Sequence, residues 1–88
     1  MQSELDPKTA FAGYDYFGHL RFNDAGRVCL DGYDFHCGEV LDVLIEKDWV
    51  NARIERSTEF YLLLSPVGKP QQAINLEQML GLIARAGS

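Results

Sequence analysis

Apolar and polar residues alternate with a period of two through the middle of the chain. In the run from 49 to 56, for example, Val50, Ala52 and Ile54 fall on one side and the side chains between them fall on the other. Successive side chains of a β-strand point to opposite faces of a sheet, so this alternation predicts strands with one buried face. The pattern recurs in residues 18–23, 28–30, 33–37, 40–45, 49–56 and 60–64.

Short stretches with turn chemistry separate these runs. Residues 23–26 bring a glycine to a turn, residues 31–32 have the composition of a two-residue hairpin, and residues 38–39 interrupt the next strand. Residues 65–70 contain two prolines, which cannot donate to a central ladder, and they predict the end of the sheet. Five or six short strands with local connections predict a mainly β fold, a small SH3-like β-barrel of antiparallel strands.

The two ends of the chain have other patterns. Near the C-terminus, apolar residues follow helical spacing at Leu76, Met79, Leu80 and Ile83. Asn75 is a suitable N-cap with Gln78 placed for a capping box, so we expect an amphipathic helix from there to near Gly87, packed on its own barrel or on another subunit. At the other end, Asp6 and Pro7 predict a short helix.

The length of 88 residues fits one domain. We divide it into an N-terminal segment (1–17), a β-barrel core (18–64), and a loop with the C-terminal helix (65–88). A hydrophobic fraction of 47% with 24% charged residues is typical of a folded globular protein. The start of the chain is acidic and no apolar run is long enough to cross a bilayer, so we expect a cytoplasmic protein that does not bind membranes.

The charge is negative and unevenly distributed. The net charge is −5, and residues 1–50 hold ten acids against four bases. Because nucleic-acid binding depends on Lys and Arg that neutralise phosphates, this balance argues against a DNA or RNA ligand. An acidic half could instead bind basic partners or mimic DNA, and this alternative stays open.

Two cysteines and two histidines are the candidates for chemistry. In the run 33–37, Tyr33, Phe35 and Cys37 share one face and His36 lies on the other, so we expect Cys37 in the core, with no catalytic residue, metal or cofactor. The spacing of all four, His19, Cys29, His36 and Cys37, differs from that of zinc sites. The alternative is a small thiol- or metal-dependent protein that uses Cys37 with His19 or His36.

Residues 32–39, Gly-Tyr-Asp-Phe-His-Cys-Gly-Glu, carry a resemblance to a known family. Together with the apolar strand 40–45, Trp49 and the Ala-Arg-Ile-Glu of 52–55, they resemble a small bacterial family of uncharacterised domains with a Gly-Tyr-x-Leu-His-Cys-Gly-Asp core. Phe35 and Glu39 replace the leucine and aspartate of that pattern. This family has no assigned activity, so the resemblance implies a fold and no chemistry.

A looser resemblance is to SH3 domains, through residues 12–16, Ala-Gly-Tyr-Asp-Tyr, and through residues 38–39 before a strand and Trp49. The closing Pro and Tyr of the SH3 motif have no counterpart after Leu64. Trp, Tyr and Arg are enriched in binding hot spots. We therefore predict a non-catalytic module for protein interaction or for self-association as a homodimer, whose contact residues are Trp49, Arg53, Tyr33, Tyr14 and Tyr16.

Overall fold

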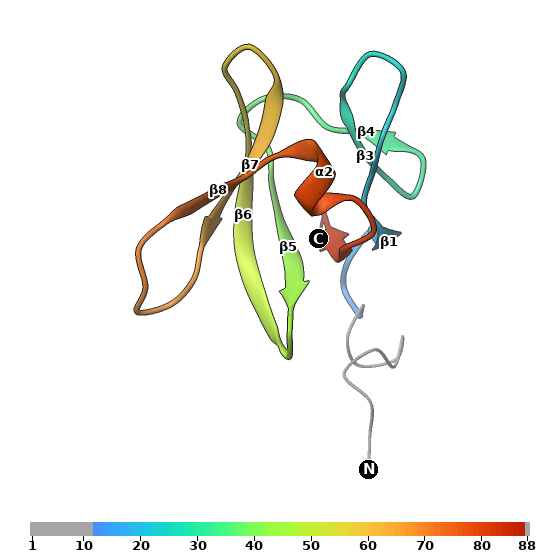
Figure 1. Ribbon diagram of the computed structural model, residues 1–88. Helices are drawn as coiled ribbons and strands as arrows, with labels where there is room; N and C mark the ends of the chain where they lie inside the picture. The colour runs from blue at the N-terminus through green and yellow to red at the C-terminus, as the bar shows by residue number, and fades with distance from the viewer. Residues whose placement is uncertain (1–11, 88) are drawn as a thin grey trace.

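The computed structural model describes residues 12–87, which form nine β-strands and one short helix (Figure 1). In chain order the elements are β1 (Tyr16–His19), β2 (Arg21–Phe22), β3 (Val28–Leu30), β4 (Tyr33–Asp34), β5 (Val40–Ile45), β6 (Asp48–Arg56), β7 (Phe60–Ser65), β8 (Gln72–Ile74), α2 (Leu76–Met79) and β9 (Ile83–Ala86). The predicted mainly β class is confirmed. The short helix predicted at Asp6 lies outside the described residues.

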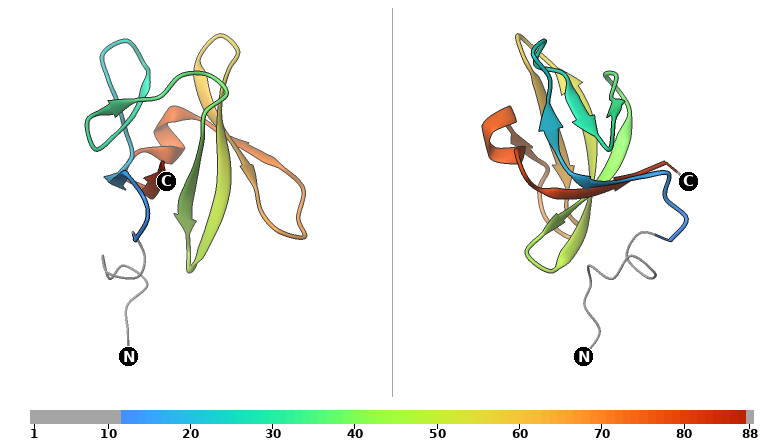
Figure 2. Two further views of the ribbon diagram at one scale, coloured as in Figure 1. Left: turned by 180° about the vertical axis from the view of Figure 1, so that it is seen from behind. Right: turned by 90° about the vertical axis from the view of Figure 1, so that its right-hand side faces the viewer.

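The strands form two antiparallel sheets. The larger sheet has the order β1-β9-β5-β6-β7-β8, and the smaller sheet has the order β2-β3-β4. The prediction of a closed β-barrel is therefore wrong, because the strands are divided between two sheets and do not close into one barrel. Figure 2 shows β9 running at a steep angle to β5 and β6, so the larger sheet is strongly bent. This bend brings its inner face over the smaller sheet.

The predicted alternation is confirmed in the long hairpin of β5 and β6. Val50, Ala52 and Ile54 of β6 are at most 8% exposed, and they face the interior together with Leu41 and Val43 of β5. The core between the two sheets is completed by Leu20, Val28, Leu30, Phe35, Phe60, Leu62, Leu64, Ile74, Met79, Ala84 and Ala86. Alternation thus fixed which face of each long strand is buried.

The predicted turns are also present. Asp31 and Gly32 both have positive φ, at 51° and 80°, which is the conformation of a type I′ hairpin turn between β3 and β4. In the turn between β2 and β3, the Asn23 side chain accepts hydrogen bonds from the backbone N–H groups of Ala25 and Arg27. Turn chemistry alone was sufficient to locate these connections.

The C-terminal helix prediction is wrong in its length. The capping box is present, because Asn75 Oδ1 accepts from the Gln78 N–H and the Gln78 side chain accepts from the Asn75 N–H. However, the helix ends at Met79, and Gly81 adopts a φ of 85° that a continuing helix excludes. Residues 83–86 then form β9, whose alternation of half-buried and buried residues is that of a strand.

The prediction that the sheet ends at Ser65 is wrong as well. After the loop that contains both prolines, β8 returns to pair with β7 in the register Leu62↔Ile74, Leu63↔Ala73 and Leu64↔Gln72. The prolines lie in the loop and at its end, so they do not interrupt a ladder. The strand after them is short and only Ile74 is buried, which leaves little apolar signal in the sequence.

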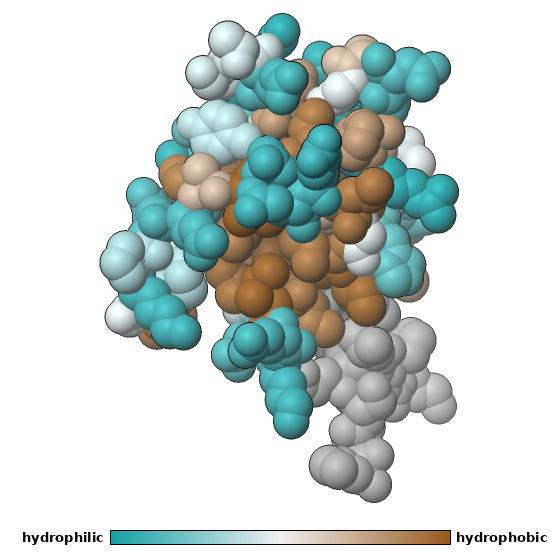
Figure 3. Space-filling model, in the orientation of Figure 1, coloured by the Kyte–Doolittle hydropathy of each residue, from teal (hydrophilic) through white to brown (hydrophobic). Residues whose placement is uncertain are grey.

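The predicted apolar stripe of the tail is divided between two elements. Met79 of α2 is fully buried, Leu80 just after it is 55% exposed, and Ile83 belongs to β9. Figure 3 shows hydrophobic side chains gathered on the surface below α2. The tail therefore contributes to the core and also leaves part of its apolar surface in contact with solvent.

Candidate functional site

A groove opens where two strands of the larger sheet diverge. β5 and β9 pair at only two positions, Asp42↔Arg85 and Val43↔Ala84, because β9 crosses β5 at a steep angle (Figure 2). The space between the diverging strands is an open groove of about 660 Å³. We name it the tyrosine groove, and its lining residues are Tyr14, Tyr16, Tyr33, Phe35, Gly38, Glu39, Val40, Leu41, Asp42, Asn51, Arg85, Ala86 and Gly87.

Three aromatic rings form one wall of the tyrosine groove. Tyr16 of β1 stacks on Tyr33 of β4, with ring centroids 4.7 Å apart and planes at 24°. Tyr33 in turn meets the ring of the buried Phe35 edge to face at 5.2 Å. Such aromatic pairs contribute about 0.5–1.5 kcal/mol each beyond the area they bury. The row therefore ties the larger sheet to the smaller one and gives the groove a firm aromatic wall.

Glu39 holds the polar end of this wall. Its Oε1 accepts a hydrogen bond from the Tyr33 hydroxyl, and its Oε2 accepts one from the backbone N–H of His36 at 2.6 Å. Burial by itself raises the pKa of Glu39, but these two hydrogen bonds and the nearby His36 outweigh it and lower the pKa below the usual value. The hydrogen bond to Glu39 also raises the pKa of Tyr33. Glu39 is therefore a fixed negative charge beside the rings.

Arg85 of β9 is the centre of a second polar cluster. Its Nε donates to Asp42 Oδ2 at 3.3 Å, and Asp42 Oδ2 also accepts from the Tyr14 hydroxyl at 3.1 Å. The guanidinium carbon lies 4.4 Å from the ring centroid of Tyr14 and 3.9 Å from that of Trp49. Arg85 thus binds a carboxylate and two aromatic faces at the same time.

The backbone of Val40 faces the groove. β5 and β6 form a hairpin with a two-residue turn, in which the closing pair, Ile45 and Asp48, exchanges hydrogen bonds across the ladder. The direction of the backbone N–H and C=O groups alternates along a strand. These groups therefore point toward β6 at Ile45, Val43 and Leu41, and toward the side of β9 at Val40. Because β9 has diverged there, the Val40 N–H and C=O are directed into the groove.

Three of the five predicted contact residues come together in this groove. Tyr14, Tyr16 and Tyr33 all line it, whereas Trp49 and Arg53 do not. Trp49 adjoins the groove through Arg85, and Arg53 lies directly across the ladder from Val40 and makes an ion pair with Glu55 at 3.4 Å. The exposed side of β6 therefore contributes Asn51 to the groove, whereas Trp49 and Arg53 lie beside it.

The sequence did not indicate several other lining residues as contact residues, among them Glu39, Val40, Asp42, Asn51 and Arg85. Arg85 was assigned to a helix, because three of the four residues 83–86 are apolar and their alternation appears only in the burial of the folded strand. Asn51 and Val40 lie on the outer face of predicted strands. The alternation of apolar and polar residues predicts that these side chains are exposed, but it does not indicate a groove. Their assembly depends on how β9 and β4 pack.

The prediction that Cys37 is buried is wrong. β4 ends at Asp34, and Phe35 is the last residue of this segment to enter the core. The chain then turns at Cys37 and Gly38, where Gly38 has a φ of 95°, and this turn leaves the Cys37 side chain exposed. The glycine therefore breaks the alternation one residue earlier than the sequence pattern indicated.

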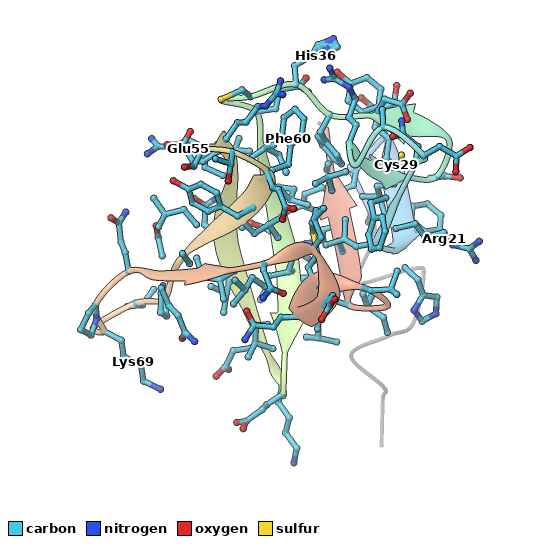
Figure 4. All side chains as sticks on the ribbon, turned by 45° about the horizontal axis from the view of Figure 1, so that its top comes forward. Arg21, Cys29, His36, Glu55, Phe60 and Lys69 are labelled. Atoms are coloured by element: carbon cyan, nitrogen blue, oxygen red, sulfur yellow. The ribbon has the colours of Figure 1, made fainter. Side chains whose placement is uncertain are left out.

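Among residues 12–87, the hydrogen bonds of the cysteine and histidine side chains do not join a cysteine to a histidine. The Cys37 Sγ approaches Glu55 Oε1 at 4.0 Å, and the exposed His36 ring lies 3.2 Å from Arg27 Nη1. Cys29 donates to Asp34 Oδ1, and burial followed by this hydrogen bond raises its pKa to about 11. Figure 4 shows Cys29 and His36 well separated.

Within residues 12–87, no group of three His, Cys, Asp or Glu side chains is placed to hold a metal ion. His19 uses its Nδ1 for a hydrogen bond with the Gly81 carbonyl at 2.9 Å. Across the same residues, no helix is long and apolar enough to span a bilayer.

The fold and the groove define a small mainly β domain of two antiparallel sheets with an aromatic surface groove. The chain belongs to the family described as "Domain of unknown function (DUF5348)", whose model matches residues 10–86. This agrees with the resemblance to an uncharacterised family that the sequence carries. No curated protein and no solved structure shows significant similarity to the chain.

Proposed function

We propose that this domain is a non-catalytic, SH3-like protein-interaction module that binds an extended peptide segment of a partner protein in the tyrosine groove. The observation that carries the proposal is the coincidence of two features at one place. The stacked rings of Tyr16 and Tyr33 supply apolar contact area, and the backbone of Val40 is directed toward the space beside them. An extended peptide uses both kinds of contact when it binds beside a strand.

The floor of the groove supports a peptide ligand. Asn51 is exposed on β6 directly opposite Asp42, and its side-chain amide can both donate to and accept from a peptide backbone. Val40 is 57% exposed on the same sheet face, so a ligand would cover an aliphatic side chain that now contacts water. Rigid tyrosines lose little conformational entropy on binding, which favours them as contact residues.

The SH3-like part of the proposal depends on the segment before β1. Residues 12–16, which resemble the opening of SH3 domains, carry Tyr14 and Tyr16 to the groove. The domain is also built from short antiparallel strands with local turns. The groove also has Tyr33 and the cluster around Arg85 beside these two tyrosines.

Selection from a random peptide library displayed on phage tests the proposal. We expect the domain to enrich peptides that perturb the backbone NMR signals of Val40, Asn51 and Tyr33. We expect Val40→Trp to weaken these peptides by roughly tenfold or more, because the larger side chain fills the groove. Val67→Trp is the matched control, since Val67 is 99% exposed on the β7–β8 loop. A selection without enriched peptides, or perturbations confined to another surface, would contradict the proposal.

A second copy of the chain is the other possible occupant, and solution mass identifies it. The chain has a mass of 9.9 kDa, so a dimer is easily distinguished from a monomer by light scattering. The proposal predicts a monomer at micromolar concentration. A dimer that becomes monomeric with Val40→Trp, but not with Val67→Trp, would show that the groove serves self-association and would overturn the partner-protein proposal.

A further inference from the structure

We infer that the peptide bound in the tyrosine groove carries a lysine or arginine, and that this basic side chain lies over the Tyr16–Tyr33 pair beside Glu39. The inference rests on the proposed function, because it names the chemistry of the same ligand. The contacts of Arg85, the charges at the groove and the position of Glu39 support this ligand.

The internal precedent is the chain's own Arg85. Its guanidinium contacts the rings of Tyr14 and Trp49 and pairs with the Asp42 carboxylate, all at one end of the groove. A cation is stabilised there by aromatic faces and a carboxylate together. The other end of the groove combines the same kinds of chemical group, two aromatic rings and a carboxylate, in Tyr16, Tyr33 and Glu39.

The charges at this second end favour a cation. Within residues 12–87, the ion pairs of Arg side chains involve Glu55 and Asp42, and neither involves Glu39 or Asp15. Asp15 borders the groove beside Gly87, since a Cβ at Gly87 would lie 2.8 Å from Asp15 Oδ2. A basic ligand over Tyr16 and Tyr33 would therefore meet the Glu39 carboxylate, with the Asp15 carboxylate beside Gly87 at the border of the groove, in a protein whose net charge is −5.

The position of Glu39 makes it a suitable partner for a basic side chain. The hydrogen bonds from Tyr33 and from the His36 N–H fix both carboxylate oxygens in place, so a ligand need not order them. The same hydrogen bonds lower the pKa of the carboxylate, which is ionised at neutral pH. A carboxylate held rigidly against aromatic rings attracts a cation more strongly than a mobile surface carboxylate does.

Charge variants at Val40 test the inference without disturbing the core, because this side chain is 57% exposed and lines the groove. The probes are the peptides selected on the wild-type domain and the same peptides with each Lys or Arg replaced by Gln. We expect the replacement of one basic residue to weaken binding by roughly tenfold. We also expect Val40→Lys to weaken the basic peptide several-fold more than Val40→Glu.

Two further variants make the test specific. Glu39→Gln removes the charge and keeps one acceptor oxygen, so it retains one of the two hydrogen bonds from Tyr33 and His36. We expect it to reduce the preference for the basic peptide over its Gln counterpart. Val67→Lys and Val67→Glu control for net charge alone. Peptides that bind in the groove with no preference for a basic residue would overturn this inference and leave the proposed function standing, whereas the absence of groove-binding peptides would overturn both.

Discussion

Arg85 and Asp42 lie directly opposite each other on β9 and β5, and their side chains form an ion pair at 3.3 Å although they are 43 residues apart in the chain. The side chains are only 16% and 24% exposed, so this pair is shielded from water more than most surface ion pairs. It joins the last strand to the central hairpin at one of their two register positions. The ion pair therefore fixes the point from which the groove opens.

We expect Arg85→Gln to lower the free energy of unfolding by about 1–2 kcal/mol, because it removes the ion pair and two cation–π contacts. Urea denaturation of the wild type, Arg85→Gln, Asp42→Asn and the double variant measures the coupling between the two side chains. Arg85→Lys should recover only part of the loss, since an ammonium does not reproduce the planar stacking of a guanidinium. Strictly additive single effects would contradict the proposed coupling.

The strand at the C-terminus can be tested through its alanines. Ala84 is fully buried at the pairing point of β9 with both β1 and β5, so Ala84→Val should destabilise the domain by about 1–3 kcal/mol through overpacking. Ala73→Val is the matched control on the exposed face of β8, and its effect should stay within about 0.5 kcal/mol. Thermal denaturation gives both values. Equal effects at the two positions would contradict the buried position of β9.

Glu39 should make the free energy of unfolding depend on pH in the acidic range. Its pKa is lower in the folded state than the usual value of 4.5, so its ionised form stabilises the fold at neutral pH. This contribution is present above about pH 4.5 and is lost as the pH falls through the lower folded-state value. Urea unfolding of the wild type and of Glu39→Gln should therefore differ more at about pH 7 than at about pH 3.

Glu77→Gln, on the exposed side of α2, is the control for this acid dependence because it removes a carboxylate away from the groove. Its difference from the wild type should change less between the same two pH values than that of Glu39→Gln. If the difference for Glu39→Gln is the same at both pH values, the hydrogen bonds from Tyr33 and His36 do not stabilise the ionised carboxylate.

The two cysteines should differ in reactivity. Cys37 is exposed, whereas burial and a hydrogen bond to Asp34 raise the pKa of Cys29 to about 11. Because the thiolate is the reactive form, iodoacetamide at about pH 8 should label Cys37 at least roughly tenfold faster than Cys29 in the folded domain. Mass spectrometry of the digested protein measures the two rates, and denaturation in urea should make them similar. Faster labelling of Cys29 in the folded state would contradict this environment.

The pH at which Cys29 ionises has a second consequence. Its folded-state pKa exceeds the usual value of 9.0, so the neutral thiol stabilises the fold below that pH, and this stabilisation is lost as the pH rises toward 11. The wild type should therefore lose stability relative to Cys29→Ala over this range. A stability difference that stays constant with pH would show that the thiol environment is the same in the folded and unfolded chains.

The sequence by itself determined the features that depend on neighbours along the chain. Alternation placed Val50, Ala52 and Ile54 in the core. The turn at Asp31 and Gly32 was predicted because Asp-Gly favours a turn with positive φ at both residues. The capping box of Asn75 was predicted because its partner, Gln78, is only three residues away in the chain. Each of these structures is decided by interactions within a few residues.

Only the tertiary structure decided where β9 lies and which side chains line the groove. Residues 83–86 form a strand because β1 and β5 provide hydrogen-bonding partners on both of its edges, and these partners are distant in sequence. The stacking of Tyr16 on Tyr33 joins two different sheets, and the turn at Gly38 leaves Cys37 outside the core. Local periodicity contains no information about such long-range contacts. The sequence therefore indicated the tyrosines as contact residues but did not predict the groove that they form together.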